Sequence, residues 1–132
     1  MAKAKLKPTL RAIGHRGPDG SGIDVAEYGP LSVVLGHARL AVLDLSPLGH
    51  QPKWSRDRRY VVAFNGEIYN HLELRRRLNL FCDGASDTAT LVELITSIGV
   101  EASLPLLNGM FAVAVVDTRE RTLWVARDPL GK

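Results

Sequence analysis

The chain has 132 residues, 45% hydrophobic and 23% charged, which is the composition of one ordinary globular domain. The net charge of +3 is mild, and only one of the basic clusters (residues 3–7, 56–59 and 75–77) has aromatic neighbours, so we expect no nucleic-acid partner. The apolar runs are too short to span a bilayer, and no apolar segment follows the basic start, so we expect neither membrane association nor a secretory signal.

Cysteine usage bears on the compartment. The sequence contains one cysteine, Cys82, which excludes a disulfide within the chain. A lone thiol suits a reducing environment, and we therefore expect a cytoplasmic location.

The first half of the chain predicts one helix and two strands. Loosely spaced leucines predict a short helix over residues 3–13, stopped by Gly14. Residues 15–22 hold three glycines and a proline, which predicts a loop. Residues 23–28 and 31–36 read as strands joined at Gly29-Pro30. A short apolar segment (40–43) and an irregular loop (46–54) follow.

A buried strand and a helix come next. Residues 60–64 predict the strand, ended sharply by Asn65-Gly66, the commonest turn dipeptide. Leucines between charges predict a helix over residues 71–80, with Asn70 as its N-cap.

The last third predicts two helices and a strand pair. Asp87 is a plausible N-cap for a helix that Gly99 ends, and a short helix is expected over residues 101–107. Residues 111–116 and 123–127 are apolar strands, and the polar turn between them predicts an antiparallel pair. Grouped helices between hairpin-connected strands favour an α+β fold with antiparallel sheets over a doubly wound parallel one.

Three segments are richer in special residues than packing requires. The first, residues 15–22, predicts a structured loop but matches no phosphate-binding pattern. In the second, the Asn65 amide and the Gly66 N–H would form a good donor pair for an oxyanion, although a plain turn is the simpler interpretation. In the third, Arg39 could hold a carboxylate and Asp87 an ammonium, which suits a free α-amino acid; a structural ion pair or a simple N-cap is the alternative.

Several motifs together resemble the class II glutamine amidotransferases, and most closely their asparagine synthetase branch. The match covers roughly residues 10–132, and its motifs follow the family's order, so a similarity by chance is very improbable. The matching segments are HRGPDG (15–20), GHARLAVLDLSPLGHQP (36–52), NGEIYN (65–70), SDT (86–88), GMFA (109–112) and ARDPLG (126–131).

The resemblance implies a fold and a glutamine site. The fold is an N-terminal-nucleophile hydrolase-like αββα sandwich of two antiparallel sheets, here expected to lack the first strand. The implied oxyanion hole is made by Asn65 and Gly66, and the implied amine ligands are Glu67 and Asp87. The substrate carboxylate is expected on Arg39 and the backbone of Leu40, Ala41, Val42 and Leu43, while residues 15–20 would form a structural loop beside the site.

The sequence departs from the family at its nucleophile. Chemistry of this kind uses an N-terminal cysteine whose thiol attacks the amide and whose free amine, with a pKa of roughly 7.7–8.0, acts as the base. Residue 1 is methionine and residue 2 is alanine, and Cys82 is internal. We therefore expect a truncated domain that binds glutamine without hydrolysing it; the alternative is a non-catalytic glutamine-binding or protein-interaction remnant.

The resemblance also sets expectations for domains and partners. Residues 1–132 are expected to form a single partial amidotransferase domain, with no ATP-dependent synthetase domain, no metal and no cofactor in this chain. L-glutamine is the expected ligand. A synthetase domain or subunit, or a second copy of the chain in a homodimer, is the expected protein partner.

Overall fold

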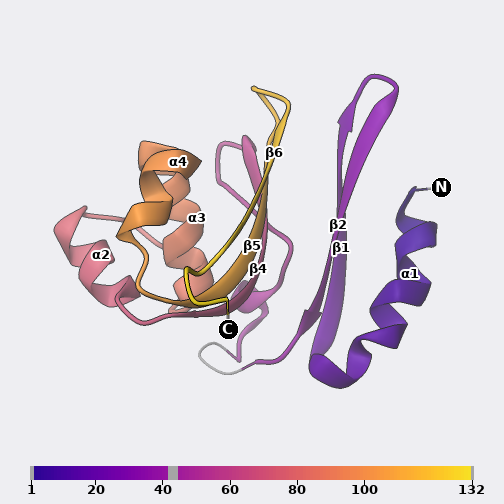
Figure 1. Ribbon diagram of the computed structural model, residues 1–132, viewed down its shortest axis with the longest axis horizontal. Coiled ribbons are helices and arrows are strands. Elements are labelled where there is room, and N and C mark those ends of the chain that lie inside the picture. Colours follow the sequence, from indigo (N-terminus) through magenta and orange to yellow (C-terminus); the bar gives the residue numbers. More distant parts are fainter. Residues whose placement is uncertain (1, 42–44, 132) are drawn as a thin grey trace.

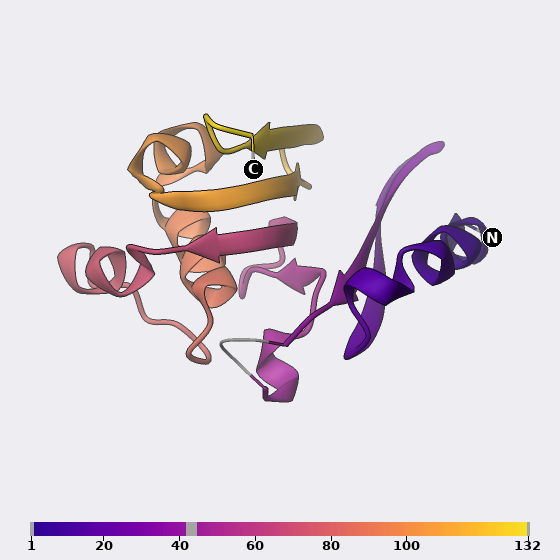
Figure 2. The ribbon, with the colours of Figure 1, turned by 60° about the horizontal axis from the view of Figure 1, so that its bottom comes forward.

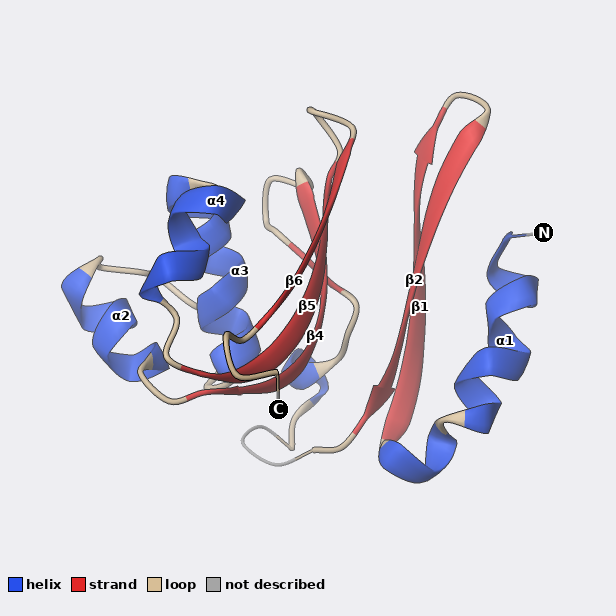
Figure 3. Ribbon diagram, viewed as in Figure 1, coloured by secondary structure: helices blue, strands red, loops and turns tan. Residues whose placement is uncertain are grey.

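The computed structural model describes residues 2–41 and 45–131, which fold into four layers. Figures 1 and 3 show helix α1 (Ala2–Ala12), a two-stranded sheet, a four-stranded sheet and a group of helices stacked in that order. The helices of the last layer are α2 (His71–Arg77), α3 (Asp87–Ile98) and α4 (Val100–Ser103). No helix of the described residues has the length and apolar character needed to cross a bilayer.

Both sheets are antiparallel. The first is the hairpin of β1 (Gly20–Tyr28) and β2 (Leu31–Arg39), paired along its whole length. The second has the order β3-β4-β5-β6. Its strands are β3 (Lys53–Trp54), β4 (Tyr60–Ile68), β5 (Gly109–Asp117) and β6 (Thr122–Arg127). The α+β fold with two antiparallel sheets predicted from the sequence is therefore confirmed.

Helix α1 covers the outer face of the hairpin, as Figure 2 shows from a second direction. Leu10 is buried there. A Cβ on Gly36 of β2 would stand 2.6 Å from the Leu6 side chain and 3.2 Å from that of Leu10. The absence of a side chain at Gly36 is thus what lets the helix lie this close to the strand.

The two sheets meet through a small apolar cluster. Its buried members are Ala26, Leu35, Val61 and Val116. One polar contact joins the sheets nearby, where the Trp54 indole Nε1 donates to Asp24 Oδ2 at 2.6 Å. Partly buried hydrophobic side chains pack around these four, and the cluster is smaller than the core described next. They are Tyr28, Val33, Trp54, Ala63 and Ala114.

The larger apolar core lies between the four-stranded sheet and α3. Alternate residues of β4 point into it, because successive side chains of a strand point to opposite faces. The fully or nearly buried members from β4 and α3 are Tyr60, Val62, Phe64, Ile68, Leu91, Val92 and Ile95. This cluster fixes the four-stranded sheet and its helices as one packed unit.

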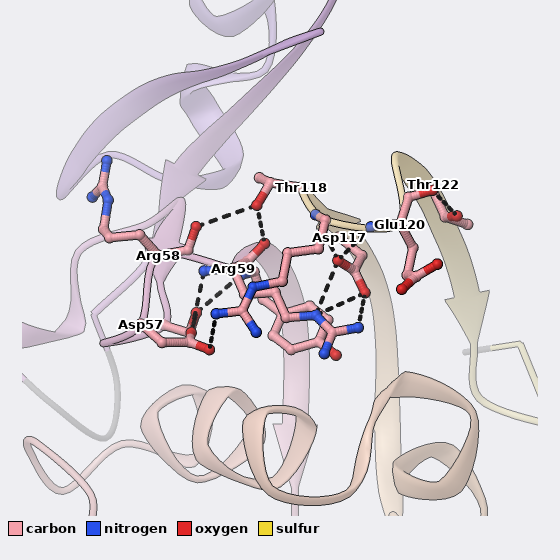
Figure 4. Close-up of polar contacts among 10 residues, drawn as sticks. Asp57, Arg58, Arg59, Asp117, Thr118, Glu120 and Thr122 are labelled. Atoms are coloured by element: carbon pink, nitrogen blue, oxygen red, sulfur yellow. Dashed lines mark hydrogen bonds and ion pairs between the residues drawn. The ribbon is translucent and has the colours of Figure 1, made fainter.

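A polar network lies where β4 begins and β5 ends (Figure 4). Arg59 binds the buried carboxylate of Asp117 in bidentate fashion, with its Nη2 2.7 Å from Oδ2 and its Nε 3.1 Å from Oδ1. The backbone N–H groups of Arg119 and Glu120 also donate to Asp117, at 3.0 and 3.1 Å. The Asp117 carboxylate therefore holds both the backbone of the β5–β6 turn and the side chain of Arg59.

The turn predicted at Asn65-Gly66 is wrong. Strand β4 continues through both residues to Ile68, and Gly66 pairs with Phe111 of β5. Gly66 reaches this pairing with a φ of +143°, a conformation that glycine adopts readily. The loop predicted over residues 15–22 is likewise too long, because β1 begins at Gly20.

Other boundaries also differ. Ser86, not Asp87, is the N-cap of α3, since its side chain accepts from Ala89 N at 3.1 Å. Asn70 is the N-cap residue of α2, as predicted, but its side chain makes no capping bond; it donates to Leu106 O and accepts from Asn108 N instead. The two-residue strand β3 lies within the predicted irregular loop. The predicted stop of α3 at Gly99, with a φ of +85°, is confirmed.

Three of the arginines in the basic clusters are held by the protein itself. Arg56 pairs with Asp83 at 3.0 Å and with Glu93 at 3.3 Å. Arg75 donates to the carbonyls of Gly84 and Ser86, and Arg59 is held by Asp117. These contacts show that the three arginines stabilise the fold. The expected absence of a nucleic-acid partner stays a prediction.

Candidate functional site

A pocket of about 600 Å³ lies where the end of β2, the outer edge of β4 and the start of α3 come together. Its volume falls within the range of small-ligand sites. It brings together every predicted site residue that the structure describes: Arg39, Leu40, Ala41, Asn65, Gly66, Glu67 and Asp87. The remaining two, Val42 and Leu43, lie outside the described residues.

The outer edge of β4 forms one wall. Strand β3 pairs with β4 only at Val61 and Val62, and no other strand of residues 2–41 and 45–131 lies beside the later residues of β4 on that edge. Side chains take the place of the strand at two of these positions. Phe64 N donates to Gln51 Oε1 at 2.6 Å, and Ile68 N donates to Asp87 Oδ2 at 2.9 Å.

Gly66 lies midway between these two capped positions. Backbone N–H groups two residues apart in a strand point the same way, so the Gly66 N–H also points away from β5. Its β5 partner, Phe111, uses its N–H and its carbonyl on the opposite side, where both bond to Asp128. The Gly66 N–H is therefore presented to the pocket, beside the exposed Asn65.

Asp87 supplies a buried carboxylate at the N-terminal end of α3. The residue is only 6% exposed, and its Oδ1 accepts from Thr88 N at 2.8 Å while Oδ2 accepts from Ile68 N. Each carboxylate oxygen has a second lone pair, which leaves capacity for a ligand ammonium. The nearby His71 has a lowered pKa, chiefly because of burial, with the charges of Asp87 and Glu67 opposing that shift.

Arg39 and the residues after it form another wall. The guanidinium Nη2 donates to Ser46 O at 2.9 Å. The loop of residues 17–19 braces the same backbone: Asp19 N donates to Arg39 O at 3.0 Å, and Ala41 N donates to Asp19 Oδ2 at 2.8 Å. The segment that the sequence predicted as a structured loop beside the site thus holds the backbone of the predicted carboxylate-binding residues.

Close packing supports this arrangement at Gly17. A Cβ there would stand 2.3 Å from the carbonyl carbon of Ala38, immediately before Arg39. Only a residue without a side chain lets the loop approach β2 so closely.

Two pocket residues were not singled out from the sequence, although both lie in the motif of residues 36–52. His37 donates from Nε2 to Phe64 O at 3.0 Å, and Gln51 accepts from Phe64 N. Gln51 is buried and also reaches Thr88 Oγ1 at 3.4 Å. The only available signal was the resemblance, because neither partner is near in sequence.

The single thiol is not at this site. Cys82 does not line the pocket, and its Sγ contacts Leu80 O at 3.9 Å. Burial raises the pKa of the Cys82 thiol, which lowers its thiolate fraction near neutral pH. Among residues 2–41 and 45–131, no group of three or more His, Cys, Asp or Glu side chains is arranged to hold a metal ion.

Comparisons with known proteins agree with this geometry. The family model described as "Glutamine amidotransferase domain" matches residues 1–132. The chain is 36% identical to a putative glutamine-hydrolysing asparagine synthetase 2 of Methanocaldococcus jannaschii, covering 99% of this chain and 28% of the relative. It is 42% identical to the glutamine-hydrolysing asparagine synthetase 1 of Arabidopsis thaliana, covering 98% of this chain and 21% of that protein.

A solved structure shares the fold. It is the glutamine phosphoribosylpyrophosphate amidotransferase from B. subtilis, complexed with ADP and GMP, with a TM-score of 0.72 and 26% identity. The similarity covers 92% of this chain and 34% of that one. The chain thus spans about a third or less of the length of these similar proteins.

Proposed function

The chain belongs to the glutamine amidotransferase domain family, in its asparagine synthetase branch, and from this premise we propose that its pocket binds free L-glutamine. The observation that carries the proposal is the Gly66 N–H. It lies on the pocket edge of β4 between two amides that side chains satisfy, and among the described residues no side chain bonds to it. An open backbone donor in a pocket that also holds an arginine and a buried carboxylate suits an α-amino acid with a carbonyl in its side chain.

Each end of glutamine has a matching group. Arg39 binds the α-carboxylate, for which a guanidinium is the best-suited partner. Glu67 and Asp87 bind the α-ammonium. The Asn65 amide and the Gly66 N–H bind the side-chain carbonyl oxygen, as an oxyanion hole does. The backbone of residues 40–43 supports the carboxylate end.

Binding is tested by thermal unfolding with increasing L-glutamine. A ligand that binds only the folded chain adds about 2.7 kcal/mol of stability at 100 times its Kd, so Tm should rise with concentration. Arg39→Ala and Asp87→Ala should each weaken the apparent affinity for glutamine by at least about tenfold, so that the rise in Tm at a given glutamine concentration is smaller. Arg76→Ala and Glu73→Ala, at exposed positions of α2, are matched controls that keep the shift. No shift for the unmodified chain at millimolar glutamine would contradict the proposal.

We further propose that these 132 residues bind glutamine without hydrolysing it. Amide hydrolysis in this family needs a cysteine thiol at the pocket, and Cys82, the one cysteine of the sequence, lies elsewhere with a raised pKa. The assay is release of glutamate from L-glutamine by the purified chain and by its Cys82→Ser variant. We expect none from either; release that Cys82→Ser abolishes would overturn this part.

Relatives indicate the setting of the domain. Their names describe glutamine-hydrolysing asparagine synthetases, and most of their length lies outside the region that this chain covers. We propose that this domain works beside a synthetase domain or subunit that uses ammonia, in the cytoplasm.

A further inference from the structure

Phe64, which precedes the oxyanion-hole residues, has both its backbone groups bonded to side chains. Its N–H donates to Gln51 Oε1 at 2.6 Å, and its carbonyl accepts from His37 Nε2 at 3.0 Å. In a β3 that extended further before Lys53 these bonds would be made by backbone, but β3 begins at Lys53 and pairs only with Val61 and Val62. Two side chains thus set the position of this edge of β4.

The two side chains are anchored on different parts of the molecule. His37 belongs to β2 in the first sheet, two residues before Arg39. Gln51 precedes β3 and reaches Thr88 Oγ1 on α3, and its backbone lies so close to Gly22 of β1 that a Cβ there would stand 1.9 Å from Gln51 O. The Phe64 peptide is therefore held relative to the walls that carry Arg39 and Asp87.

The His37 ring is suited to a fixed donor role. A carbonyl oxygen can only accept, so Nε2 carries the hydrogen. Burial lowers the pKa of His37, the Phe64 carbonyl opposes that shift, and the neighbouring His50 and Arg39 lower it further. The lowered pKa favours the neutral ring, and in the tautomer with its hydrogen on Nε2 the buried Nδ1, which has no partner among the described residues, carries a lone pair.

We propose that His37 and Gln51 are positioning residues that hold the Phe64 peptide and so aim the Asn65 amide and the Gly66 N–H at the side-chain carbonyl of glutamine. The inference rests on the proposed function and adds a residue-level cause for the geometry of the oxyanion hole. Rigid placement matters because a hydrogen bond weakens steeply when its donor moves out of line with the acceptor.

Two ligands separate positioning from general damage. L-norvaline has the α-carboxylate, α-ammonium and carbon chain of glutamine, but a methyl group replaces the carboxamide. It tests the amino-acid end of the pocket alone, whereas L-glutamine also uses the Asn65 amide and the Gly66 N–H. The ratio of the two Kd values therefore measures what the oxyanion hole contributes.

The experiment is a titration of the isotope-labelled 132-residue chain with each ligand, followed by NMR, for the unmodified chain and for His37→Leu, Gln51→Met and His37→Gln. We expect the unmodified chain to prefer glutamine, and His37→Leu and Gln51→Met to lose that preference by about tenfold while norvaline binds as before. His37→Gln, whose amide can donate to Phe64 O, should recover most of the preference. Bound norvaline also shows that a variant is folded.

The outcomes separate the two proposals. An unchanged preference in His37→Leu and Gln51→Met, or equal weakening of both ligands, would overturn the positioning role while glutamine binding by the unmodified chain still stands. If the unmodified chain binds neither ligand, or binds both equally, the proposed function fails and the inference fails with it.

Discussion

At Gly66 the backbone φ is +143°, and a Cβ would stand 2.0 Å from the carbonyl oxygen of Met110 on β5. Both facts act on the same residue that presents the open N–H. A side chain there would push β4 away from β5 or force the peptide to rotate. Either movement turns the N–H out of its direction in the pocket.

Gly66→Ala should therefore lower both stability and glutamine binding. Strain at such a position together with the overlap predicts a loss of at least about 2 kcal/mol in unfolding free energy, measured by urea denaturation. Gly14→Ala is the matched control, because nothing lies within 4 Å of its added Cβ and its backbone is not in the left-handed region. It should change stability by no more than about 0.5 kcal/mol. Equal losses from the two substitutions would show that the overlap has no effect.

Motifs were the basis for naming single residues at the site, and the roles of these residues stay predictions. Arg39, Asn65, Gly66, Glu67 and Asp87 were named from the sequence, and the structure brings them to one pocket. His37 and Gln51 were not named, because their role depends on a peptide group 27 and 13 residues away. Patterns of spacing along the chain carry no signal for such contacts.

Among the elements, those with a strong local pattern were predicted best. The hairpin turn at Gly29, the end of α3 at Gly99 and the β5–β6 pair follow from turn chemistry and apolar runs. The turn predicted at Asn65-Gly66 was wrong because nine residues of pairing with β5 outweigh the local preference of the dipeptide. Strand β3 was missed because two residues hold no periodicity.

The turn between β5 and β6 gives a prediction about pH. Burial raises the pKa of Asp117, but hydrogen bonds from Arg59 and from the N–H groups of Glu120 and Arg119 outweigh it, so the pKa lies below its ordinary 3.8. A carboxyl with a lowered folded pKa stabilises the fold fully above its unfolded pKa. That contribution is lost as the pH falls from 3.8 through the lower folded value.

Asp117→Asn should remove this part of the acid dependence. Unfolding free energy measured from pH 7 to pH 2.5 should be lower for the variant at neutral pH and should decline less steeply below about pH 4. Glu27→Gln, at an exposed position of β1, is the control and should follow the unmodified chain. Parallel curves for Asp117→Asn and the unmodified chain would contradict the stabilising role of the Arg59–Asp117 network.

At the scale of the whole molecule, the two sheets differ in the size of the apolar clusters that hold them. The hairpin meets the four-stranded sheet through the small cluster around Ala26, Leu35, Val61 and Val116. The four-stranded sheet shares the larger core with α3. Local opening follows such differences in buried apolar contact.

Hydrogen exchange should therefore separate the two sheets. We expect amides of β1 and β2 to exchange through openings of lower free energy than those at the centre of β5, measured by native-state exchange in low denaturant. Trp54→Phe removes the hydrogen bond to Asp24 and should increase the difference in opening free energy between the two sheets. Equal protection of both sheets would mean that the molecule opens only as one unit.

The order of the elements predicted antiparallel sheets, and the family resemblance predicted that there are two. Neither predicted how firmly the two sheets are joined. Side-chain contacts between distant segments, such as the bond from Trp54 to Asp24, decide that point.

The walls of the pocket come from both sides of this junction. Arg39 ends a strand of the first sheet, whereas Asp87 begins a helix packed on the second. An amino acid held by both would tie the hairpin to the body of the molecule, so separating the sheets would first require its release. A small metabolite would then act as a removable cross-link, and the hairpin would separate from the four-stranded sheet less often as the metabolite's concentration rises.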